Sequence, residues 1–319
     1  MHSPLVTVIC LCYNQSRFVR EAIQSVLDQT YSEIQLIVVD DASTDNSTAI
    51  INDLVVEHPS IETLFLKENY GNCRAFNHGL ALAKGEFIID LAADDVLMPE
   101  RISQQINFFS TLDNSYGVVF TDATYINEEG RFLRDHYDYL FRKGLLKTIP
   151  QGDVYSQIIT RYFVSSPTML VRKKVLDEMK GYDETLSYED FDFWIRSARH
   201  YKYGFLNQKL TKVRRITRSM STGWYKQGDK QLHSTYLVCK KIASLNRTEE
   251  EHTALATRLK YELRQSVFSE NFYEAGLFYD FLKETARAGT VDGFLHTINK
   301  LKLPLSFFRR WYHKLRFGL

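Results

Sequence analysis

The sequence lacks the features that define several common protein classes. Four cysteines occur among its 319 residues, at Cys10, Cys12, Cys73 and Cys239, without a CxxC pair or a neighbouring histidine cluster. They are too few for a disulfide framework, and their spacing does not predict a zinc site. Cys10 and Cys12 alternate along an apolar stretch, so we interpret them as small buried side chains on one face of a strand.

Neither charge nor hydropathy points to a nucleic acid or to a membrane-spanning protein. Forty basic and 39 acidic residues leave a formal net charge of +1, and no run approaches the ~18 apolar residues that a transmembrane helix requires. No basic segment precedes the short apolar stretch 6–12, so no signal peptide is predicted. We therefore expect a cytoplasmic protein that binds no nucleic acid.

Several motifs of common enzymes are missing as well. The sequence has no Walker A motif, no GxGxxG fingerprint and no evident arrangement of a hydrolase nucleophile with its base. P-loop and dinucleotide binding are therefore not predicted.

What the sequence does contain is a regular alternation of strand and helix patterns. The expected strands are 6–12, 34–39, 63–66 and 87–90, and the expected helices lie at 18–27, around 50–55 and at 72–83. Alternation at this spacing is typical of βαβ units and predicts an α/β fold with a mainly parallel sheet.

The pattern changes near residue 228. From about Asp229 onward it is helical, and Thr248 followed by three glutamates predicts a capped helix start with an acidic first turn. We expect an α/β domain over 1–228 and a helical extension over 229–319.

Polar residues follow three of the expected strands. Tyr13 and Asn14 come after the first strand, Asp40-Asp41 ends the second, and Asp94-Asp95 follows the fourth. Ligands of open α/β sheets bind beyond the carboxyl ends of the strands, so three polar strand ends predict a ligand site.

Each candidate carboxylate has a structural alternative. Asp94 and Asp95 can hold Mg²⁺ or Mn²⁺, or they form a solvated turn in which Asp95 caps the next helix. Asp41 can accept hydrogen bonds from a base or a ribose, or it caps a helix. Asp190 lies beside aromatic residues and can act as a general base, although acidic residues also favour helix N-termini for dipole reasons. Arg74 can contact a phosphate or a base, or it lies on a surface turn.

Taken in order, these segments resemble glycosyltransferase family 2. The matching segments are 6–14, 25–30, 39–45, 69–77, 83–95, 181–184 and 189–196, within a stretch from Val6 to Ser221 that spans about two-thirds of the chain. Each segment is short, and it is their shared order that makes the resemblance specific.

The resemblance implies the GT-A fold and an inverting transfer of a sugar from a nucleotide donor, with UDP as the expected nucleotide and Mn²⁺ or Mg²⁺ as cofactor. It implies that Tyr13 stacks on the nucleobase, that Asp41 hydrogen-bonds to it, and that Asp190 is the catalytic base. Asp95 is expected to bind the metal, and Asp94 to lie near the ribose or sugar. The full set of expected donor-binding residues is Leu11, Tyr13, Asp41, Arg74, Asp94, Asp95 and Arg215.

One segment departs from the family pattern. The family often carries a histidine shortly before a Ser-x-Ser sequence, found here at 219–221, and this histidine helps to hold the metal or the diphosphate. The matching residue here is Ile216, flanked by Arg214, Arg215 and Arg218. We therefore expect arginines to bear more of the diphosphate charge.

The acceptor is expected to be a hydroxyl of a glycan or a lipid-linked glycan. The chain lacks the Gln-x-x-Arg-Trp signature of processive synthases, so we expect one sugar per acceptor. Residues 131–162, on the acceptor side, contain no motif that identifies the acceptor.

Two other functions stay open, a non-catalytic scaffold that binds nucleotide sugars and a sugar nucleotidyltransferase. The latter usually has a glycine-rich loop at the position of residues 11–15.

The end of the chain is basic and amphipathic. Residues 300–319 hold six basic residues and no acidic one, and on a helix Leu305, Phe308 and Trp311 lie opposite Arg309 and Arg316. Such a segment can lie in an anionic membrane surface at the inner face of the plasma membrane, or it packs its apolar side on the protein. Both interpretations stay open.

Overall fold

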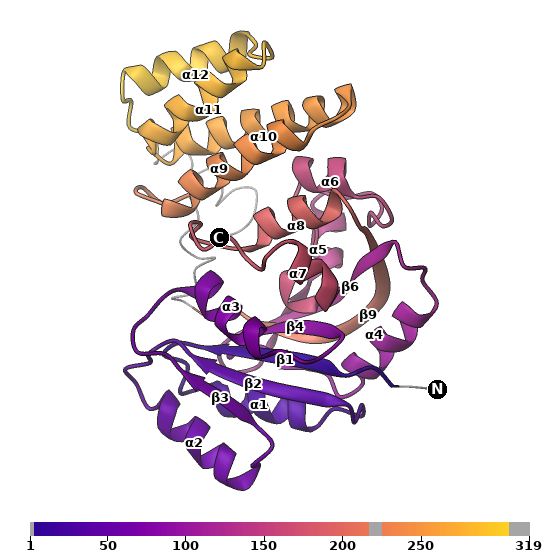
Figure 1. Cartoon of the computed structure of the whole chain (residues 1–319). Helices are drawn as coiled ribbons and strands as arrows, with labels where there is room; N and C mark the ends of the chain where they lie inside the picture. The colour runs from indigo at the N-terminus through magenta and orange to yellow at the C-terminus, as the bar shows by residue number, and fades with distance from the viewer. Residues whose placement is uncertain (1–2, 217–224, 306–319) are drawn as a thin grey trace. The chain divides into compact units, whose positions relative to one another are not determined.

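The computed structural model describes residues 3–216 and 225–305. Its contacts divide the chain into two compact units (Figure 1). The N-terminal unit holds the described residues up to 154 together with 163–185 and 192–216, and the C-terminal unit holds 155–162, 186–191 and the described residues from 225 onward.

The N-terminal unit is an α/β structure. Its strands are β1 (Val6–Cys12), β2 (Ile34–Asp40), β3 (Glu62–Phe65), β4 (Phe87–Ala92), β5 (Val96–Leu97), β6 (Tyr116–Ile126), β7 (Phe132–Asp135), β8 (Leu170–Arg172) and β9 (Lys202–Arg214). Its helices are α1 (Val19–Leu27), α2 (Ser47–Glu57), α3 (Asn72–Leu82), α4 (Arg101–Ser110), α5 (His136–Arg142), the 3-10 helix η1 (Ser166–Thr168) and α7 (Lys173–Glu178).

The nine strands form one mixed sheet. Its order is β3-β2-β1-β4-β8-β6-β9-β5, and β7 pairs with β6. Strands β1 to β4 run parallel, as the alternation of elements predicts, and β6 runs parallel to β9. The short strand β8 pairs antiparallel with both β4 and β6 and so joins the two parallel groups.

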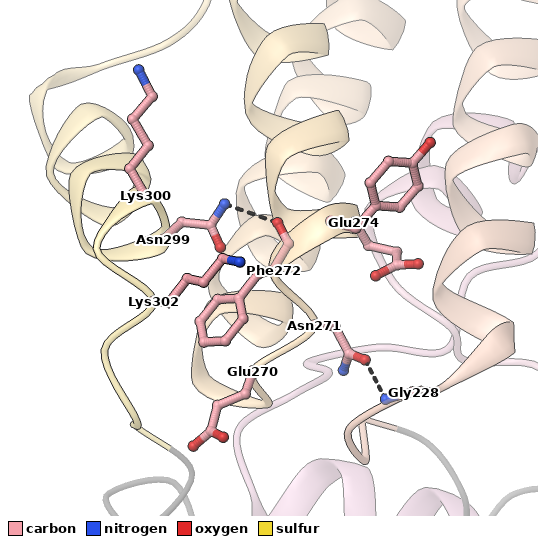
Figure 2. Close-up of a pocket in the computed structure, with 9 residues that line it drawn as sticks. Gly228, Glu270, Asn271, Phe272, Glu274, Asn299, Lys300 and Lys302 are labelled. Atoms are coloured by element: carbon pink, nitrogen blue, oxygen red, sulfur yellow. Dashed lines mark hydrogen bonds between the residues drawn. The ribbon is translucent and has the colours of Figure 1, made fainter.

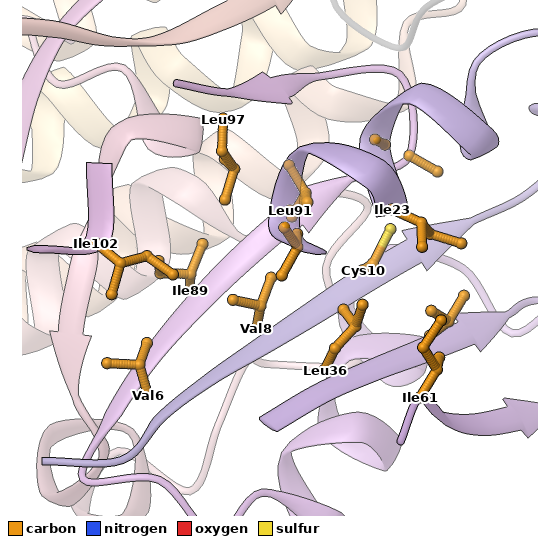
Figure 3. Close-up of a cluster of buried hydrophobic side chains, with 14 of the residues drawn as sticks. Val6, Val8, Cys10, Ile23, Leu36, Ile61, Ile89, Leu91, Leu97 and Ile102 are labelled. Carbon is orange, nitrogen blue, oxygen red and sulfur yellow. The ribbon is translucent and has the colours of Figure 1, made fainter. Parts of the chain in front are cut away.

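Alternate residues of the central strands build the core on one face of the sheet (Figure 3). Val6, Val8 and Cys10 of β1 are fully buried there, and residues of α1, α2 and α4, such as Ile23 and Ile102, pack against them. Each fully buried aliphatic side chain contributes about 1.5–3 kcal/mol. The interpretation of Cys10 as a small buried residue is confirmed, and Cys12 is buried beside it.

Helix α3 covers the other face of the sheet at close range. A Cβ atom at Gly79 would lie 2.6 Å from Cγ2 of Ile9 and 3.0 Å from Cγ2 of Val39. Glycine therefore lets the helix backbone approach β1 and β2 closely.

The C-terminal unit is helical. It contains α6 (Tyr155–Thr160), α9 (Lys230–Leu245), α10 (Glu249–Phe268), α11 (Phe272–Glu284) and α12 (Thr290–Lys300). Helix α8 (Asp190–Ala198) gives its first two residues to this unit and the rest to the N-terminal unit. The capped start predicted for α10 is confirmed, because Thr248 and Glu251 form a capping box.

A buried ion pair lies inside the C-terminal unit. The fully buried Glu262 accepts a hydrogen bond from Nη1 of Arg258 at 3.1 Å and another from the Tyr225 hydroxyl at 2.9 Å. Nε of Arg258 donates to the carbonyl of Ile159 in α6 at 2.8 Å. Burial raises the pKa of Glu262, and the Arg258 guanidinium opposes this rise. The pair thus links α10 to a segment about 100 residues earlier in the chain.

A second segment from the middle of the chain belongs to this unit. The backbone N–H of Ser187 donates to Oγ of Ser234 at 2.9 Å, and the Tyr188 hydroxyl lies 2.7 Å from Oγ1 of Thr235. The ring of Phe191 lies 5.1 Å from the Arg258 guanidinium carbon. The boundary expected near residue 228 did not include these two short segments. Within the described part of the chain, no helix is long and apolar enough to cross a bilayer.

Candidate functional site

The ends of β1, β2 and β4 meet at one edge of the sheet. Leu11 pairs with Val39 on one side and with Ala92 on the other, in two parallel ladders. Leu11, Val39 and Ala92 therefore lie side by side, and the segments that follow them leave the sheet at the same edge. The predicted donor-binding residues at this edge are Leu11, Tyr13, Asp41, Asp94 and Asp95.

Asn14 fastens the turn after β1 to the loop after β2. Its backbone is left-handed, with φ 54°, and its Oδ1 accepts hydrogen bonds from the N–H groups of Thr44 at 2.7 Å and Asp45 at 3.3 Å. The backbone N–H of Asn14 donates to Oγ of Ser43 at 2.9 Å. The turn so held leaves Tyr13 45% exposed.

Asp41 bridges two loops. Its two carboxylate oxygens accept hydrogen bonds from the backbone N–H groups of Tyr70 at 2.8 Å and Gly71 at 2.9 Å. The helix-capping interpretation is therefore wrong for Asp41. Each carboxylate oxygen keeps a second lone pair, so the side chain can still accept from a ligand.

Asp95 is tied to the end of β9. Its Oδ1 accepts a hydrogen bond from the backbone N–H of Arg214 at 2.8 Å, while Nε of Arg214 donates to the carbonyl of Asp94 at 2.9 Å. Asp95 is 3% exposed, and helix α4 has Glu100, not Asp95, at its N-cap. The alternative of a solvated turn with Asp95 as a helix cap is therefore wrong.

Burial has the largest effect on the pKa values of Asp94 and Asp95. It raises the pKa of Asp94, and it raises that of Asp95 well above its usual range, where the charge of Asp94 adds to the effect. Arg215 lowers both pKa values, and Arg214 lowers that of Asp94. A divalent cation bound at these two carboxyls would oppose the rise in both pKa values, because it favours the charged forms.

Arg101 is a charged residue beneath this site that the sequence did not reveal. Its side chain is fully buried, and it donates from Nε to Gln105 at 3.1 Å and from Nη2 to the carbonyl of Met169 at 3.0 Å. Burial lowers its pKa to about 9, and the charge of Asp95 opposes this change. Arg101 therefore supplies a fixed positive charge near Asp95.

The two arginines at the end of β9 differ in how deeply they are buried. The guanidinium of Arg214 is buried and contacts Glu21 at 2.6 Å, along with three backbone carbonyls. The expectation that Arg214 carries diphosphate charge is wrong, because its donors serve the fold. Arg215 is half-buried and lies 4.4 Å from the centre of the Tyr125 ring. Arg218 and the Ser-x-Ser sequence at 219–221 lie outside the described residues.

Arg74 is engaged by a carboxylate. Its Nε donates to Glu184 at 2.9 Å, and its guanidinium carbon lies 5.4 Å from the centre of the Tyr70 ring. Asn77, one helical turn later, donates to the other oxygen of Glu184 at 3.0 Å. Two of the sequence segments behind the resemblance, 69–77 and 181–184, therefore meet in space.

Gly181 allows this meeting. Its φ is +71°, and a Cβ atom there would lie 2.2 Å from Oδ1 of Asn77. That oxygen instead accepts the N–H of Tyr182 at 2.9 Å. A side chain at this position would force Asn77 away and disconnect α3 from the loop that holds Glu184.

Asp190 lies in the C-terminal unit, as the first residue of α8. It stands between two anchored aromatic residues, Tyr188 and Phe191. Asp192, two residues later, is 1% exposed and pairs with Arg196 at 2.6 Å. Asp192 therefore serves the fold, whereas Asp190 is half-buried.

The C-terminal unit contains a cavity of its own (Figure 2). Its volume is about 590 Å³, and none of the predicted site residues lines it. Asn299 donates to the carbonyl of Phe272 at 2.9 Å, and Asn271 accepts from the N–H of Gly228 at 2.8 Å. Since its amides serve the fold and its lining carries both glutamates and lysines, it has no single-sign charge to select a ligand.

Metal binding would rely on few protein ligands. Within the described ranges, no group of three or more His, Cys, Asp or Glu side chains is arranged to hold a metal ion. A cation at Asp94 and Asp95 would take its other ligands from a diphosphate and from water, which is usual for Mg²⁺.

This geometry agrees with a family match. Residues 7–180, more than half of the chain, match the model of glycosyl transferase family 2. The chain belongs to this family. The match covers every predicted donor residue except Arg215 and stops short of Asp190.

Curated relatives of this family 2 chain come from bacteria and archaea. An uncharacterized glycosyltransferase of Rickettsia typhi is 30% identical over 67% of this chain and 64% of its own length. One of Methanocaldococcus jannaschii is 26% identical over 67% of this chain and 72% of its own length. The chain spans between 28% and 65% of the length of relatives from four Rickettsia species.

Solved structures share the fold. TarS residues 1–349 from S. aureus, in complex with UDP-GlcNAc, superpose with a TM-score of 0.72 at 19% identity, over 98% of this chain and 92% of that one. A mannosyltransferase from Pyrobaculum calidifontis, in complex with GDP-Man and Mn²⁺, gives a TM-score of 0.60 at 18% identity, over 98% and 84%. The expected α/β fold with a sheet flanked by helices is confirmed.

Proposed function

We propose that this protein transfers a single sugar from a nucleotide-sugar donor to a hydroxyl of a glycan or lipid-linked glycan, with inversion at the anomeric carbon. The observation that carries the proposal is the meeting of Tyr13, Asp41, Asp94 and Asp95 at one edge of the sheet in a family 2 chain. Two structural neighbours hold UDP-GlcNAc or GDP-Man, which supports a nucleotide sugar as the donor.

The loops after β1 and β2 would bind the nucleotide. The exposed Tyr13 ring would stack on the base, and Asp41 would accept a hydrogen bond from the N–H of uracil. The hydrogen bonds of Asp41 to Tyr70 and Gly71 already fix its direction, so no side-chain entropy remains to be lost when a base binds. We therefore propose that UDP is the nucleotide of the donor.

Asp95, with Asp94, would hold Mn²⁺ or Mg²⁺, which supplies positive charge for the diphosphate when bound. Arg215 lies close enough to lower the pKa of both carboxyls, and it would contact the same diphosphate. The buried Arg101 opposes the rise that burial causes in the pKa of Asp95 and so favours the charged carboxylate. These fixed charges would stabilise the leaving group as the glycosidic bond to the diphosphate breaks.

Asp190 would take the proton from the acceptor hydroxyl while that oxygen attacks the anomeric carbon. The new bond forms on the face opposite the departing diphosphate, so one displacement inverts the configuration. The assignment rests on the family resemblance, and it is supported by the anchoring of Tyr188 and Phe191 on either side of Asp190.

Two measurements test the proposal. Mass spectrometry of reactions with a panel of UDP- and GDP-sugars should reveal a glycosylated product, or donor hydrolysis where no acceptor is supplied. UDP with Mn²⁺ should raise the melting temperature more than UDP alone, because a ligand that binds only the native state stabilises it. Equal shifts with and without the metal would contradict the role of Asp95.

The two other functions predict different results. A non-catalytic scaffold would show the thermal shift without turnover of any donor. A sugar nucleotidyltransferase would release pyrophosphate from a nucleoside triphosphate and a sugar phosphate, and this can be measured directly.

A further inference from the structure

One buried arginine at the end of β9 connects the loop after β4 to α1. The side chain of Arg214 is 2% exposed, and its Nη2 donates to Glu21 of α1 at 2.6 Å. Its Nε donates to the carbonyl of Asp94 at 2.9 Å, and its backbone N–H donates to Oδ1 of Asp95 at 2.8 Å. Arg214 therefore contacts both carboxylate residues of the proposed metal site, one through its side chain and one through its backbone.

The remaining guanidinium nitrogen of Arg214 holds the turn between β6 and β7. Its Nη1 donates to the carbonyls of Asn127 at 3.2 Å and Glu128 at 3.1 Å. The guanidinium carbon lies 4.7 Å from the centre of the Phe18 ring, directly before α1. Because a guanidinium is planar and rigid, these contacts fix the carbonyl of Asp94 relative to α1 and to this turn.

Glu21 supplies the negative charge that this buried guanidinium needs. Among the described residues it is the one acidic side chain that pairs with Arg214. A buried charge that loses its partner is strongly disfavoured, so without Glu21 the guanidinium should move and release the carbonyl of Asp94. A guanidinium left unpaired near Asp94 would also repel a divalent cation. Both effects would weaken metal binding.

The backbone contact of Arg214 also distinguishes the two oxygens of Asp95. Oδ1 accepts the N–H of Arg214, whereas Oδ2 has no hydrogen-bond partner in the described part of the chain. Oδ2 is therefore the oxygen available to a metal ion. One such oxygen is enough for a cation that takes its other ligands from a diphosphate and from water.

We propose that Glu21 and Arg214 form a positioning pair for the metal site, in which Glu21 holds Arg214 and Arg214 holds Asp94 and Asp95. Neither member of the pair is a metal ligand. The inference rests on the proposed function, because that function makes Asp94 and Asp95 the metal-binding residues. Replacement of a residue that orients metal ligands typically changes metal affinity 10–100-fold, so the pair should set how tightly Mn²⁺ binds.

The test measures the dissociation constant of UDP by calorimetry, in EDTA and over a range of Mn²⁺ concentrations. In Glu21→Gln, the Mn²⁺ concentration that gives half of the metal-dependent gain in affinity should rise about tenfold. This is the lower end of the range for such partners, because the backbone contact to Asp95 remains. UDP affinity in EDTA should stay unchanged, since the hydrogen bonds that Asp41 accepts from Tyr70 and Gly71 are kept.

The matched control is Glu57→Gln. Glu57 of α2 pairs with Arg20 at 3.8 Å, and its side chain is 57% exposed, against 56% for Glu21. The control therefore removes a comparable ion-paired carboxylate, and it should leave the Mn²⁺ dependence unchanged.

A double-mutant cycle tests whether Glu21 acts through Arg214. Arg214→Gln should raise the half-saturating Mn²⁺ concentration at least as much as Glu21→Gln does, and the double variant should add nothing further. If Arg214→Gln does not fold, Arg214→Lys takes its place in the cycle, because an ammonium group cannot keep the forked contacts of a guanidinium.

Each other result counts against the pair. An unchanged Mn²⁺ dependence in Glu21→Gln would overturn it even if that variant melts at a lower temperature, because a purely structural ion pair affects stability alone. Additive effects in the double variant would overturn it as well, since Glu21 would then act independently of Arg214. A wild type that binds no UDP, or binds it equally with and without Mn²⁺, would overturn the proposed function and the pair together.

Discussion

At the scale of single residues, Asp190 and Asp95 are expected to contact different parts of the reaction. Asp190→Asn keeps the size and polarity of the side chain but removes the basic oxygen. A general base contributes roughly 10²–10⁴-fold in rate, so transfer should fall by about that factor, measured as product formed per minute. Donor affinity should stay unchanged, because Tyr13, Asp41 and Asp95 remain.

The matched comparison is Asp95→Asn. This variant should weaken the metal-dependent part of UDP binding as well as turnover, measured as the loss of the extra thermal shift that Mn²⁺ gives. Asparagine caps helices about as well as aspartate does, so a purely structural Asp190 predicts a stable and nearly active Asp190→Asn enzyme. That result would contradict the assignment and leave Glu189 as the candidate base, since Asp192 is paired with Arg196.

The sequence indicated the polar strand ends but not how their side chains are used. Asp41 and Asp95 could be named because each follows an apolar strand, and strand ends of a parallel sheet meet at one edge. That Arg214 is buried could not be read from the sequence, because its burial depends on a carboxylate and on carbonyls far away in the chain. Arg101 was missed for a similar reason, since an arginine in an amphipathic helix is normally assigned to the solvent face.

At the scale of secondary-structure elements, local signals predicted well and non-local ones did not. The bounds of β1 and the capped start of α10 follow from residues next to each other. The membership of residues 155–162 and 186–191 in the C-terminal unit depends on hydrogen bonds to α9 and α10, between residues 47 to 99 positions apart. No periodicity in the sequence carries that information.

The buried pair in α10 gives a prediction at this scale. Glu262→Gln removes the charge that compensates the buried Arg258, and the loss of one partner of a buried pair costs about 3–5 kcal/mol. Glutamine still accepts hydrogen bonds, so we expect the lower end of that range, measured by urea unfolding. Arg258 also packs on Phe191, so transfer should fall together with stability while UDP affinity is retained.

The matched control is Glu250→Gln, an exposed glutamate on the same helix. Surface substitutions of this kind usually change the free energy of unfolding by no more than about 0.5 kcal/mol. Equal stabilities of the two variants would show that the Arg258–Glu262 pair contributes nothing to the C-terminal unit. Lower UDP affinity in Glu262→Gln would contradict the separation of donor binding from this network.

At the scale of the whole molecule, the alternating pattern of the first 90 residues predicted the parallel part of the sheet. The antiparallel insertion of β8 between β4 and β6 was not predicted, because a strand of three residues has too short a pattern to recognise. Residues 306–319, on which the membrane hypothesis largely depends, lie outside the described residues. The last described helix, α12, ends at Lys300.

The basic segment 300–319 carries the last prediction. Its six basic residues and no acidic one give an attraction to anionic lipid of about 1 kcal/mol for each residue near the surface, and its aromatic residues can insert at the interface. Deletion of 304–319 should therefore abolish sedimentation with phosphatidylserine vesicles, while neutral phosphatidylcholine vesicles should bind neither protein. Because surface charge is screened within about 10 Å at 0.1 M salt, binding of the full chain should weaken as salt rises. Replacement of Arg309 and Arg310 by glutamate in the full-length chain should reproduce the deletion. Unchanged vesicle binding after the deletion would instead indicate that this segment packs its apolar side on the protein, and that variant should then melt at a lower temperature.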